Sequence, residues 1–435
     1  MENKVLSTSS IMKTIIMAGG KGKRIASINA EVPKPMIEVC GKPILEYQIE
    51  SLKKQNLTDI IMVIGHLGNV IEEYFGNGEI YGVHIEYIRE ECPLGTAGAL
   101  YFLKDAITDD FLLINGDILF DVDMTLFLAA HRRNHSMATI FTHPNSHPYD
   151  SGIIVADQEG VVTQWMTKEE ERKWYKNRVN AGLHLLSAKL LNQFEKPEKK
   201  DLDRDVLKSL VAERKLSVYD SPEYVKDMGT PDRYFAVEMD IKSGLIKKRN
   251  LSVKQKAIFL DRDGTINKYV GFLRNIEDFV LLDGVSEAIR LINKSGYLAI
   301  VITNQPVIAR GEVSWGELME IHNKMETLLG NDGAYVDDIF CCPHHPDKGY
   351  AGERAEYKKV CMCRKPSPGL LLQAAQKYNI NLHNSWMVGD SLNDMEAGRR
   401  AGCNVIYLGH EKSEEKLTAS SLLESVKLIL TNADK

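Results

Sequence analysis

Long apolar runs are absent from this chain of 435 residues. The longest, at residues 297–302, has six apolar residues, whereas a membrane-spanning helix needs about 20. The apolar stretch near the N-terminus, residues 15–18, is too short for the core of a signal peptide. We therefore expect no membrane span and no export, and we expect the protein to be cytoplasmic.

An excess of charge of either sign is also missing. Lysine and arginine number 54, and aspartate and glutamate 60, which gives a formal net charge of −6. A general nucleic-acid-binding protein would be strongly basic, so nucleic acid is not an expected partner and any phosphate recognition must be local. With 44% hydrophobic residues and little net charge, the composition is not that of a disordered chain.

Cysteine is scarce, with seven residues, and five of them lie between Cys341 and Cys403. In a chain that is not exported, cysteines are expected to be thiols or metal ligands. Cys-x-His and Cys-x-Cys pairs separated by sixteen residues supply three thiolates and an imidazole, which suit a closed, structural zinc site. His345 is an alternative to the adjacent histidine, and Cys341 is expected to be a small buried residue. The predicted Zn²⁺ ligands are Cys342, His344, Cys361 and Cys363.

Strand-like runs alternate with amphipathic helical stretches, and the alternation begins at residues 14–17 and restarts at 256–260. This pattern predicts an α/β fold with two Rossmann-like, three-layer domains. We place the domains at residues 1–240 and 256–435. Residues 241–255 are rich in lysine and arginine and contain no acidic residue, which predicts an exposed basic linker. The alternative is a solvated helix face inside one larger domain.

A glycine-rich loop follows the first strand-like run, at residues 18–24 (AGGKGKR). Glycines let backbone N–H groups approach phosphate oxygens closely. The loop is not the dinucleotide fingerprint, because Ile25 stands where the third glycine belongs, and it lacks the P-loop pattern. A glycine turn with surface bases is the alternative for the loop alone. The candidate phosphate-binding residues are Gly19, Gly20, Gly22, Arg24 and Lys34, the last of which lies between two prolines.

Together, GGxGxR and the Pro-Lys-Pro at residues 33–35 resemble the sugar-1-phosphate nucleotidyltransferases, over residues 13 to about 240. The resemblance implies in-line attack by a sugar 1-phosphate oxygen on the α-phosphorus of a nucleotide, with pyrophosphate leaving. As catalytic residues, Arg24 would hold the pyrophosphate and Lys34 would neutralise phosphate charge. The family's segment beside the base and sugar corresponds to Gly95, Thr96 and Gly98.

Two aspartates in this half are candidate Mg²⁺ ligands. Asp117 directly follows the strand-like run 111–114, at the sheet edge where α/β proteins bind ligands, and Asp227 precedes a tight turn. A lone aspartate after a strand is more often a cap or a turn former, but both match the family's carboxylates. Hard oxygen ligands suit Mg²⁺, which would bridge the reacting phosphates.

The resemblance also implies contacts to the sugar. Asn180 and Gly182 match the family's sugar-contacting turn. Lys168 is the candidate for the sugar phosphate, although Thr167 stands where the family has a glutamate. A solvated helix face is the alternative for the charged run at residues 168–176.

The second strand-like run ends in residues 261–265 (DRDGT). Aspartates two residues apart after a strand suit a nucleophile, Asp261, and a general acid/base, Asp263. An EF-hand loop is excluded, because the glycine falls at position 4 and Phe272 occupies position 12, where calcium binding needs a glutamate.

This half resembles the haloacid-dehalogenase phosphatases. The resemblance implies that Thr303 and Asn304 contact the phosphate, that Arg364 and Lys365 supply its cations, and that Asp390 binds Mg²⁺ with Asp261 and the backbone carbonyl of Asp263. Asp394 is either an outer carboxylate or a residue that starts a helix. Because Arg364 and Lys365 directly follow Cys363, zinc would fix the loop that carries both cations.

Within that superfamily, the zinc pattern with DRDGT and TNQ is similar to D-glycero-D-manno-heptose 1,7-bisphosphate phosphatases and to histidinol-phosphate phosphatases. Pro306 and Val307 replace two small residues of the family's loop. Arg310 and Arg364 remain available for a second phosphate.

The two halves are expected to catalyse consecutive reactions. Removal of the 7-phosphate from heptose 1,7-bisphosphate gives heptose 1-phosphate, which a nucleotidyltransferase of the heptose-1-phosphate guanylyltransferase type would join to GMP from GTP, with α as the expected anomer. One alternative combines mannose- or glucose-1-phosphate nucleotidyl transfer with histidinol-phosphate hydrolysis. Another makes the C-terminal domain a noncatalytic zinc module. Oligomeric state is not readable from the sequence.

Overall fold

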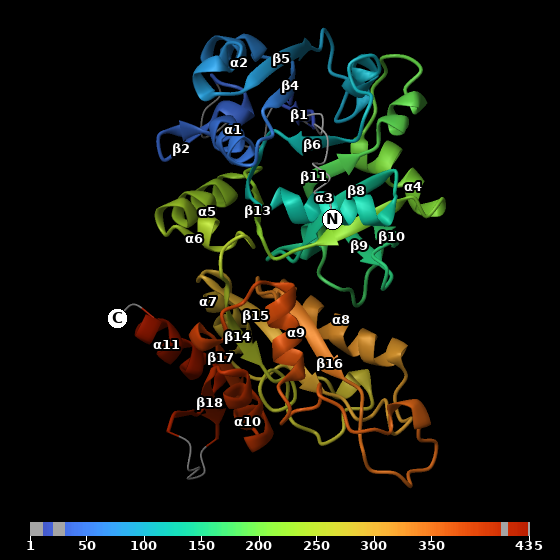
Figure 1. Ribbon diagram of the computed structural model, residues 1–435, viewed down its shortest axis with the longest axis vertical. Coiled ribbons are helices and arrows are strands. Elements are labelled where there is room, and N and C mark those ends of the chain that lie inside the picture. Colours follow the sequence, from blue (N-terminus) through green and yellow to red (C-terminus); the bar gives the residue numbers. More distant parts are fainter. Residues whose placement is uncertain (1–11, 21–30, 410–415, 434–435) are drawn as a thin grey trace, which may run out of the picture. The chain divides into compact units, whose positions relative to one another are not determined.

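The computed structural model describes residues 12–20, 31–409 and 416–433. They form two compact units (Figure 1). The first comprises Met1–Thr142, Ile154–Trp165 and Asn180–Lys247, and the second comprises His143–Ile153, Met166–Val179 and Lys248–Lys435. No helix in the described parts of the chain is both long and apolar enough to span a bilayer.

Two short segments before residue 180 belong to the second unit, which the sequence did not indicate. Arg178 explains part of this, because its Nη1 lies 3.2 Å from Glu326 Oε2 and both side chains are at least 96% buried. The expectation of an exposed linker at 241–255 is wrong at Arg249, which is 3% exposed. Its guanidinium pairs with Asp337 at 3.1 Å, because a buried cation needs a charged partner.

In the first unit, the described residues form a nine-stranded mixed sheet with the order β10-β9-β11-β6-β1-β4-β5; in addition, β8 pairs with β11, and β12 pairs with β8. β1 pairs in parallel with both β4 and β6, and β11 runs antiparallel to β6. The large sheet's strands are β1 Thr14–Met17, β4 Asp59–Ile64, β5 His84–Arg89, β6 Phe111–Asn115, β8 Ala138–His143, β9 Ile153–Ala156, β10 Val162–Met166, β11 Val179–Leu186 and β12 Leu216–Asp220. Two small pairs are β2 Glu38–Val39 with β3 Lys42–Pro43, and β7 Ile118–Asp121 with β13 Tyr224–Asp227.

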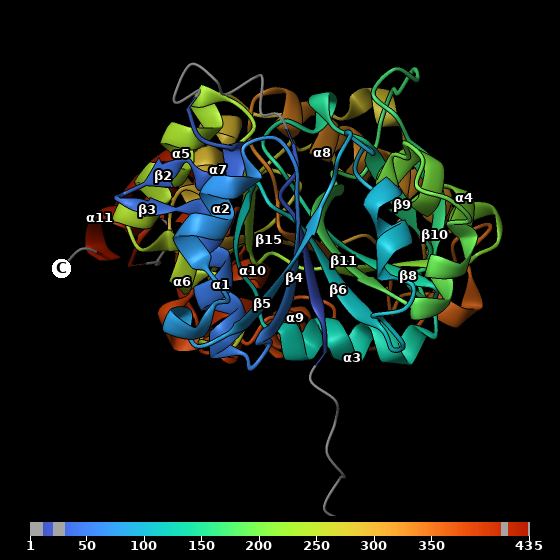
Figure 2. The ribbon, with the colours of Figure 1, turned by 90° about the horizontal axis from the view of Figure 1, so that it is seen from above.

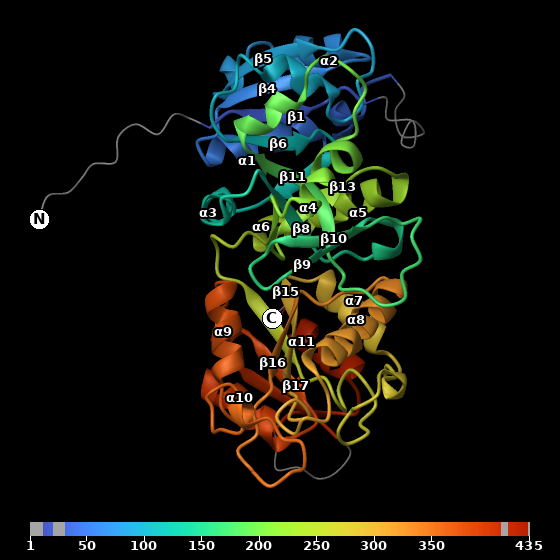
Figure 3. The same cartoon turned by 90° about the vertical axis from the view of Figure 1, so that its right-hand side faces the viewer.

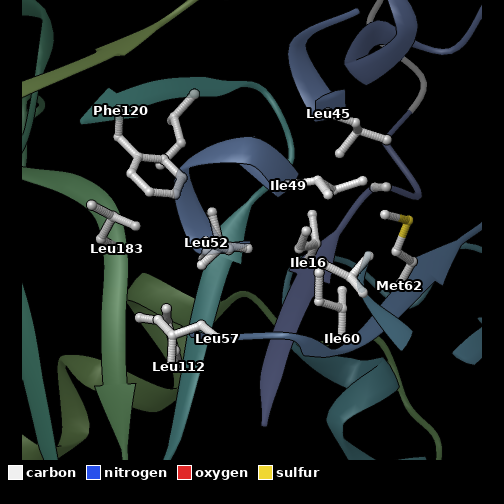
Figure 4. Close-up of a cluster of buried hydrophobic side chains, with 14 of the residues drawn as sticks. Ile16, Leu45, Ile49, Leu52, Leu57, Ile60, Met62, Leu112, Phe120 and Leu183 are labelled. Carbon is white, nitrogen blue, oxygen red and sulfur yellow. The ribbon is translucent and has the colours of Figure 1, made fainter. Parts of the chain in front are cut away.

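Strand alternation gives this sheet two apolar faces. Ile16 of β1 packs into one hydrophobic cluster, and Ile15 packs into another. In the first cluster, Ile16 faces Ile49 of α1 (Figure 4), and α1 and α2 lie on the same side of the sheet (Figure 2). A sheet covered on both faces makes three layers. The helices are α1 Ile44–Lys54, α2 Gly68–Phe75, α3 Met124–Asn134, α4 Ser209–Ala212, α5 Pro231–Lys242 and α6 Leu245–Lys248.

The second unit contains a parallel sheet, six-stranded over the described residues, with the order β16-β15-β14-β17-β18-β19. Its strands are β14 Lys256–Leu260, β15 Tyr297–Asn304, β16 Asp338–Cys342, β17 Trp386–Gly389, β18 Asn404–Leu408 and β19 Thr418–Ala419. Its helices are α7 Val285–Asn293, α8 Trp315–Asn331, α9 Gly369–Lys377, α10 Leu392–Ala401 and α11 Leu422–Ala433.

This sheet is also covered on both faces. Ile258 and Leu260 of β14 pack into the cluster that includes residues of α7, α8 and α11, whereas Ala257 and Phe259 pack against residues of α9 and α10. Figure 3 shows α9 and α10 on one side of the strands and α7 and α8 on the other. The predicted α/β class with two three-layer units is therefore confirmed, and the carboxyl ends of the parallel strands meet at one edge of each sheet.

Candidate active sites

In the first unit, Lys34 and Asp117 form an ion pair. Asp117 lies just beyond β6, whose last residue, Asn115, is in register with Met17 of β1, so the pair lies at the edge where the glycine loop begins. Lys34 starts a 3₁₀ turn, Lys34–Met36, directly after Pro33. Its side chain is 11% exposed, which leaves its charge largely protected from water.

Asp227 is held beside Asp117 through the backbone. β13 pairs antiparallel with β7, placing Asp227 opposite Ile118, and the next backbone N–H, of Met228, donates to the carbonyl of Asp117 at 3.0 Å. Burial alone would raise the pKa of Asp227, but Arg233 Nη1 lies 2.9 and 3.0 Å from its two oxygens and holds the pKa below its ordinary value. Arg233 was not predicted from the sequence. It lies in the first turn of α5, which begins at Pro231.

The segment at residues 94–98 packs its glycines against another stretch of backbone. Gly95 has φ +78°, and a Cβ there would collide with the carbonyl oxygen of Lys200, so glycine suits the position. The hydroxyl of Thr96 accepts from the backbone N–H of Leu202 at 2.7 Å. The hydroxyl thus fixes the neighbouring loop, and the predicted nucleotide contact of this segment stays a prediction.

Glu90 is a residue of this site that the sequence reasoning missed. Its carboxylate accepts from the backbone N–H of Leu94 at 3.2 Å, and a Cβ built on Gly19 would lie 2.5 Å from Glu90 Oε2. Burial raises the pKa of Glu90 above its ordinary value. A carboxylate therefore faces the start of the glycine loop. Gly20 is exposed, and Gly22 and Arg24 lie outside the described residues.

Asn180 lies in a polar network on β11. Its Oδ1 accepts from the backbone N–H of Gly182 at 3.2 Å and lies 3.1 Å from His184 Nε2, and its Nδ2 donates to Asp203 at 3.0 Å. The structure therefore brings Asn180 and Gly182 together. Lys168 is exposed, belongs to the second unit, and has its Nζ 3.9 Å from Asp150.

In the second unit, Asp261 follows β14 and meets Lys365. Lys365 Nζ donates to Asp261 Oδ1 at 2.5 Å and to the carbonyl of Ile302 at 2.8 Å. Burial raises the pKa of Asp261 to about 7, with Lys365 opposing and Asp394 adding to the rise. Burial opposes the charge on Lys365, but the two aspartates together raise its pKa above its ordinary value. Lys365 thus faces two carboxylates, Asp261 and Asp394, and this part of the site contains more carboxylates than cations.

Asp394 starts a helix, which is one of the two roles that the sequence left open, and it also contacts Lys365. Its Oδ2 accepts from the backbone N–H and the hydroxyl of Ser391, which caps α10, while its Oδ1 lies 2.6 Å from Lys365 Nζ. Asp390 lies close by, and burial first, then Asp394, raises the pKa of Asp390 to about 6.

Oxygen atoms of Asp261, Asp390 and Asp394 all lie within 4.8 Å of one another. A Cβ on Gly264, at φ +86°, would collide with the Asp390 carboxylate. These three carboxylates form a group that could hold a metal ion, and the two predicted ligands, Asp261 and Asp390, belong to it. Hard oxygen donors and an excess of negative charge both fit a divalent ion such as Mg²⁺.

Asp263 is surrounded by hydrogen-bond donors. Arg262 Nη2 lies 2.9 Å from both carboxylate oxygens, Asn267 donates at 3.0 Å and Gln305 at 2.7 Å. Burial would raise the pKa of Asp263, but these donors, Arg262 foremost, hold it below its ordinary value. The second aspartate of DRDGT thus has a fixed orientation.

Thr303 and Asn304 end β15 beside this cluster. The Thr303 hydroxyl is buried and accepts from Gln305 at 2.8 Å. The Asn304 side chain accepts from the backbone N–H of Lys365 at 3.0 Å and donates to its carbonyl at 3.1 Å. Asn304 therefore positions the lysine, and its predicted phosphate contact stays a prediction.

Arg310 has its guanidinium between two aromatic rings. Its Cζ lies 4.1 Å from the ring centroid of Tyr350 and 4.5 Å from that of Phe272, and its Nε donates to Glu312 at 2.8 Å. Arg364 donates from Nη1 to the carbonyl of His344 at 3.1 Å. The two ring contacts and the hydrogen bond from Nε fix the orientation of the Arg310 guanidinium, and its two terminal nitrogens remain available to bind an anion.

The four predicted zinc ligands lie together. Cys363 Sγ is 3.2 Å from Cys342 Sγ, 3.3 Å from Cys361 Sγ and 3.3 Å from His344 Nδ1. All four ligand atoms lie within 4.8 Å of one another, so this cluster could hold a metal ion. The Cys342 thiol foremost, with Cys361 and His344, lowers the pKa of Cys363 to about 5, which favours the thiolate that metal binding requires. Three sulfurs and one imidazole fit zinc.

Two family models match the sequence. The model described as nucleotidyl transferase matches residues 13–244, and the HAD-hydrolase-like model matches residues 362–427.

Relatives of known activity match the C-terminal part. D-glycero-beta-D-manno-heptose-1,7-bisphosphate 7-phosphatase of Pasteurella multocida is 40% identical over 176 residues, which cover 40% of this chain and 93% of the relative. The corresponding alpha-heptose enzyme of Photorhabdus laumondii is 41% identical over 182 residues, covering 40% of this chain and 97% of the relative. The solved structure of HddC from Yersinia pseudotuberculosis is 24% identical, covers 53% of this chain and 99% of its own, and has a TM-score of 0.46.

Proposed function

Because this chain belongs to the nucleotidyl transferase family over residues 13–244 and, in its C-terminal part, to the heptose-1,7-bisphosphate 7-phosphatase family, we propose that it is a bifunctional enzyme of nucleotide-activated heptose synthesis. The C-terminal part removes the 7-phosphate of D-glycero-D-manno-heptose 1,7-bisphosphate. The N-terminal part joins the resulting heptose 1-phosphate to GMP from GTP, releasing pyrophosphate and giving GDP-heptose.

The observation that carries the proposal is the geometry at Asp261. A buried carboxylate lies 2.5 Å from a buried ammonium group, Lys365, and beside Asp390, at the carboxyl end of a central parallel strand. Phosphoryl transfer needs a nucleophile among fixed positive charges. The hydrolysis product, a sugar 1-phosphate, is the substrate that the N-terminal family requires.

In the hydrolysis, Asp261 attacks the phosphorus of the 7-phosphate. The bond between phosphorus and the C7 oxygen breaks, and Asp263, which its donors otherwise hold as a carboxylate, must enter this step protonated in order to give a proton to that oxygen. Asp263 then takes a proton from a water molecule whose oxygen attacks the phosphorus, and the bond between phosphorus and the Asp261 oxygen breaks, so that inorganic phosphate leaves. Lys365 and the Thr303 hydroxyl contact the transferred group, and Arg310 and Arg364 bind the distal 1-phosphate. Held by Asp261, Asp390 and the backbone carbonyl of Asp263, Mg²⁺ would supply positive charge beside the phosphoryl group.

In the N-terminal reaction, the glycine loop binds the triphosphate. Lys34 neutralises phosphate charge, Arg24 holds the leaving pyrophosphate, and the segment at residues 94–98 contacts the nucleoside. Asn180 and Gly182 contact the sugar. Asp117 and Asp227 would hold Mg²⁺, whose positive charge would offset the repulsion between the reacting phosphates. The nucleotide is GTP and the anomer is α.

The Cys/His cluster is a structural zinc site in this proposal. Its four ligands would complete the usual tetrahedral coordination of a structural zinc ion and would leave no position for a reacting water. Cys363 directly precedes Arg364 and Lys365, so Cys363 and its three partner ligands, with zinc bound, would fix the loop that carries both cations.

An assay that measures phosphate and pyrophosphate separately tests the proposal. With Mg²⁺, purified protein should release phosphate from heptose 1,7-bisphosphate without any nucleotide. Pyrophosphate should appear from heptose 1-phosphate with GTP, and much more slowly with ATP, CTP or UTP. Hydrolysis of histidinol phosphate with no hydrolysis of heptose bisphosphate would contradict the assignment.

A further inference from the structure

Behind the acid/base Asp263 lies a buried cation whose partners are unusual. Arg262 is completely buried, although taking a guanidinium out of water costs several kcal/mol unless its donors are all well used. Two of its nitrogens contact Asp263: Nη2 lies 2.9 Å from each carboxylate oxygen and Nε lies 3.3 Å from Oδ1. The planar fork of an arginine thereby fixes the plane of the aspartate.

The remaining nitrogen of the fork, Nη1, lies 3.2 Å from Nε2 of His322. An arginine has no acceptor and stays protonated in proteins. The histidine must therefore accept the hydrogen bond, which requires an imidazole without a proton on Nε2. His322 lies inside α8, is 3% exposed, and has its pKa lowered to about 3 by burial first and by the Arg262 charge second. A neutral acceptor is thus built into the helix beneath the active-site loop.

Other side chains limit how the Asp263 carboxylate could turn. Asn267 donates to Oδ1 at 3.0 Å, and Gln305 donates to Oδ2 at 2.7 Å while also reaching the Thr303 hydroxyl. Of these supports, the contact between Arg262 and His322 is the one that reaches across to a helix. Without it, the guanidinium has one buried N–H group unpaired and is free to tilt.

We propose that His322 is a positioning residue of the phosphatase: through Arg262, it sets the orientation in which Asp263 gives a proton to the leaving oxygen. The inference rests on the proposed hydrolysis of a phosphate monoester by Asp261 and Asp263. If it is correct, loss of the His322 hydrogen bond should lower kcat/KM only for esters whose leaving oxygen needs a proton.

A matched pair of variants separates the hydrogen bond from the bulk of the side chain. In His322→Gln, the amide oxygen reaches about as far as Nε2 and can accept from Arg262. In His322→Asn, the shorter side chain leaves Arg262 Nη1 without an acceptor. Both replacements are polar and uncharged, so the cost of burying a polar side chain is present in both variants and does not account for a difference between them.

The readout is kcat/KM for two esters, because this ratio reports the steps through phosphoryl transfer to Asp261. Heptose 1,7-bisphosphate has a strongly basic leaving oxygen, whereas 4-nitrophenyl phosphate releases a stable anion without protonation. General acid catalysis is typically worth about 10²- to 10⁴-fold. We expect His322→Asn to lose about 10-fold or more on the sugar ester and less than about 3-fold on the aryl ester, with His322→Gln near wild type on both.

An equal loss on both esters, or no loss on either, would overturn the inference. Asp263→Asn gives the pattern of a missing acid for comparison, and near-UV circular dichroism together with the Tm of the second unit checks that each variant is folded. If wild type cleaves 4-nitrophenyl phosphate but not heptose bisphosphate, the proposed substrate fails. The His322 comparison is then made with histidinol phosphate, which has a similarly basic leaving oxygen.

Discussion

Lys365 contacts more groups of the phosphatase site than its sequence motif predicts. Its Nζ contacts Asp261, Asp394 and the carbonyl of Ile302, and its backbone is held from both sides by Asn304. An ammonium group with these contacts stays charged, and its one positive charge is shared between two of the clustered carboxylates, so the cluster keeps a net negative charge.

We expect Lys365→Met to lower phosphatase kcat by about 10²- to 10³-fold, the usual effect of removing one fixed charge-stabilising group. Its loss also leaves buried carboxylates without their partner, which costs about 3 kcal/mol of stability. Stopped-time phosphate release and chemical denaturation measure the two effects. Guanylyl transfer should continue at near the wild-type rate, and its loss would contradict the assigned role.

His184 makes the stability of the first unit pH-dependent. Complete burial lowers its pKa to about 4, from 6.5 for an exposed histidine. The unfolded chain therefore binds a proton below pH 6.5 that the folded chain refuses until pH 4, so stability is full above pH 6.5 and falls as the pH drops. The loss amounts to about 3 kcal/mol at the acid end.

Thermal unfolding of the wild type and of His184→Gln, measured between pH 7.5 and pH 4.5, tests this effect. Gln keeps an amide that can donate to Asn180 but does not titrate. The difference in Tm between the two proteins should shift in favour of the variant as the pH falls. A difference that stays constant over this range would contradict the account, because it would show that folding does not shift the pKa of His184.

Residues in contiguous motifs were predictable, and their distant partners were not. Asp261 and Asp390 follow apolar strand-like runs, and parallel strands bring such positions to one edge. Glu90, Arg233 and His322 carry no pattern of their own, because ordinary helices and strands contain the same residue types. Their importance comes from contacts that only the folded chain defines.

At the scale of elements, the alternating strands were the strongest signal. The three layers of each unit follow from apolar residues that face both sides of β1 and β14. The placement of residues 166–179 in the second unit could not be predicted, because it depends on a few buried pairs such as Arg178 with Glu326. Likewise, the basic run at 241–255 gave no sign that Arg249 is buried against Asp337.

The loop from Cys342 to Lys365 should depend on its metal. We expect Cys361→Ser to lose bound zinc, to lower the Tm of the second unit, and to reduce phosphate release by at least 10-fold, because the ion holds the loop that carries Arg364 and Lys365. Elemental analysis, calorimetry and phosphate release measure these effects.

Cys403→Ser is the matched control for Cys361→Ser. Cys403 is buried directly before β18 and does not belong to the Cys/His cluster. The control variant should keep its metal and its phosphatase activity. Full metal content in Cys361→Ser, or full activity without metal, would contradict the structural role of the site.

For the whole molecule, the near-neutral charge hides two phosphate-binding sites in which cations and carboxylates compensate each other. Lys34 with Asp117, Arg233 with Asp227 and Lys365 with Asp261 are such pairs. Composition excluded an extended basic surface but could not reveal local pairs, since a net charge sums over them. The order of the two reactions likewise follows from chemistry, because the product of one is the substrate of the other.

The central claim is that the C-terminal site makes the substrate of the N-terminal site. It is tested most directly by giving Asp261→Asn protein GTP, Mg²⁺ and either heptose 1,7-bisphosphate or heptose 1-phosphate, and by measuring pyrophosphate. The account predicts no pyrophosphate from the bisphosphate and a wild-type rate from the 1-phosphate, whereas wild-type protein releases pyrophosphate from both. Pyrophosphate release from the bisphosphate by Asp261→Asn would contradict the account.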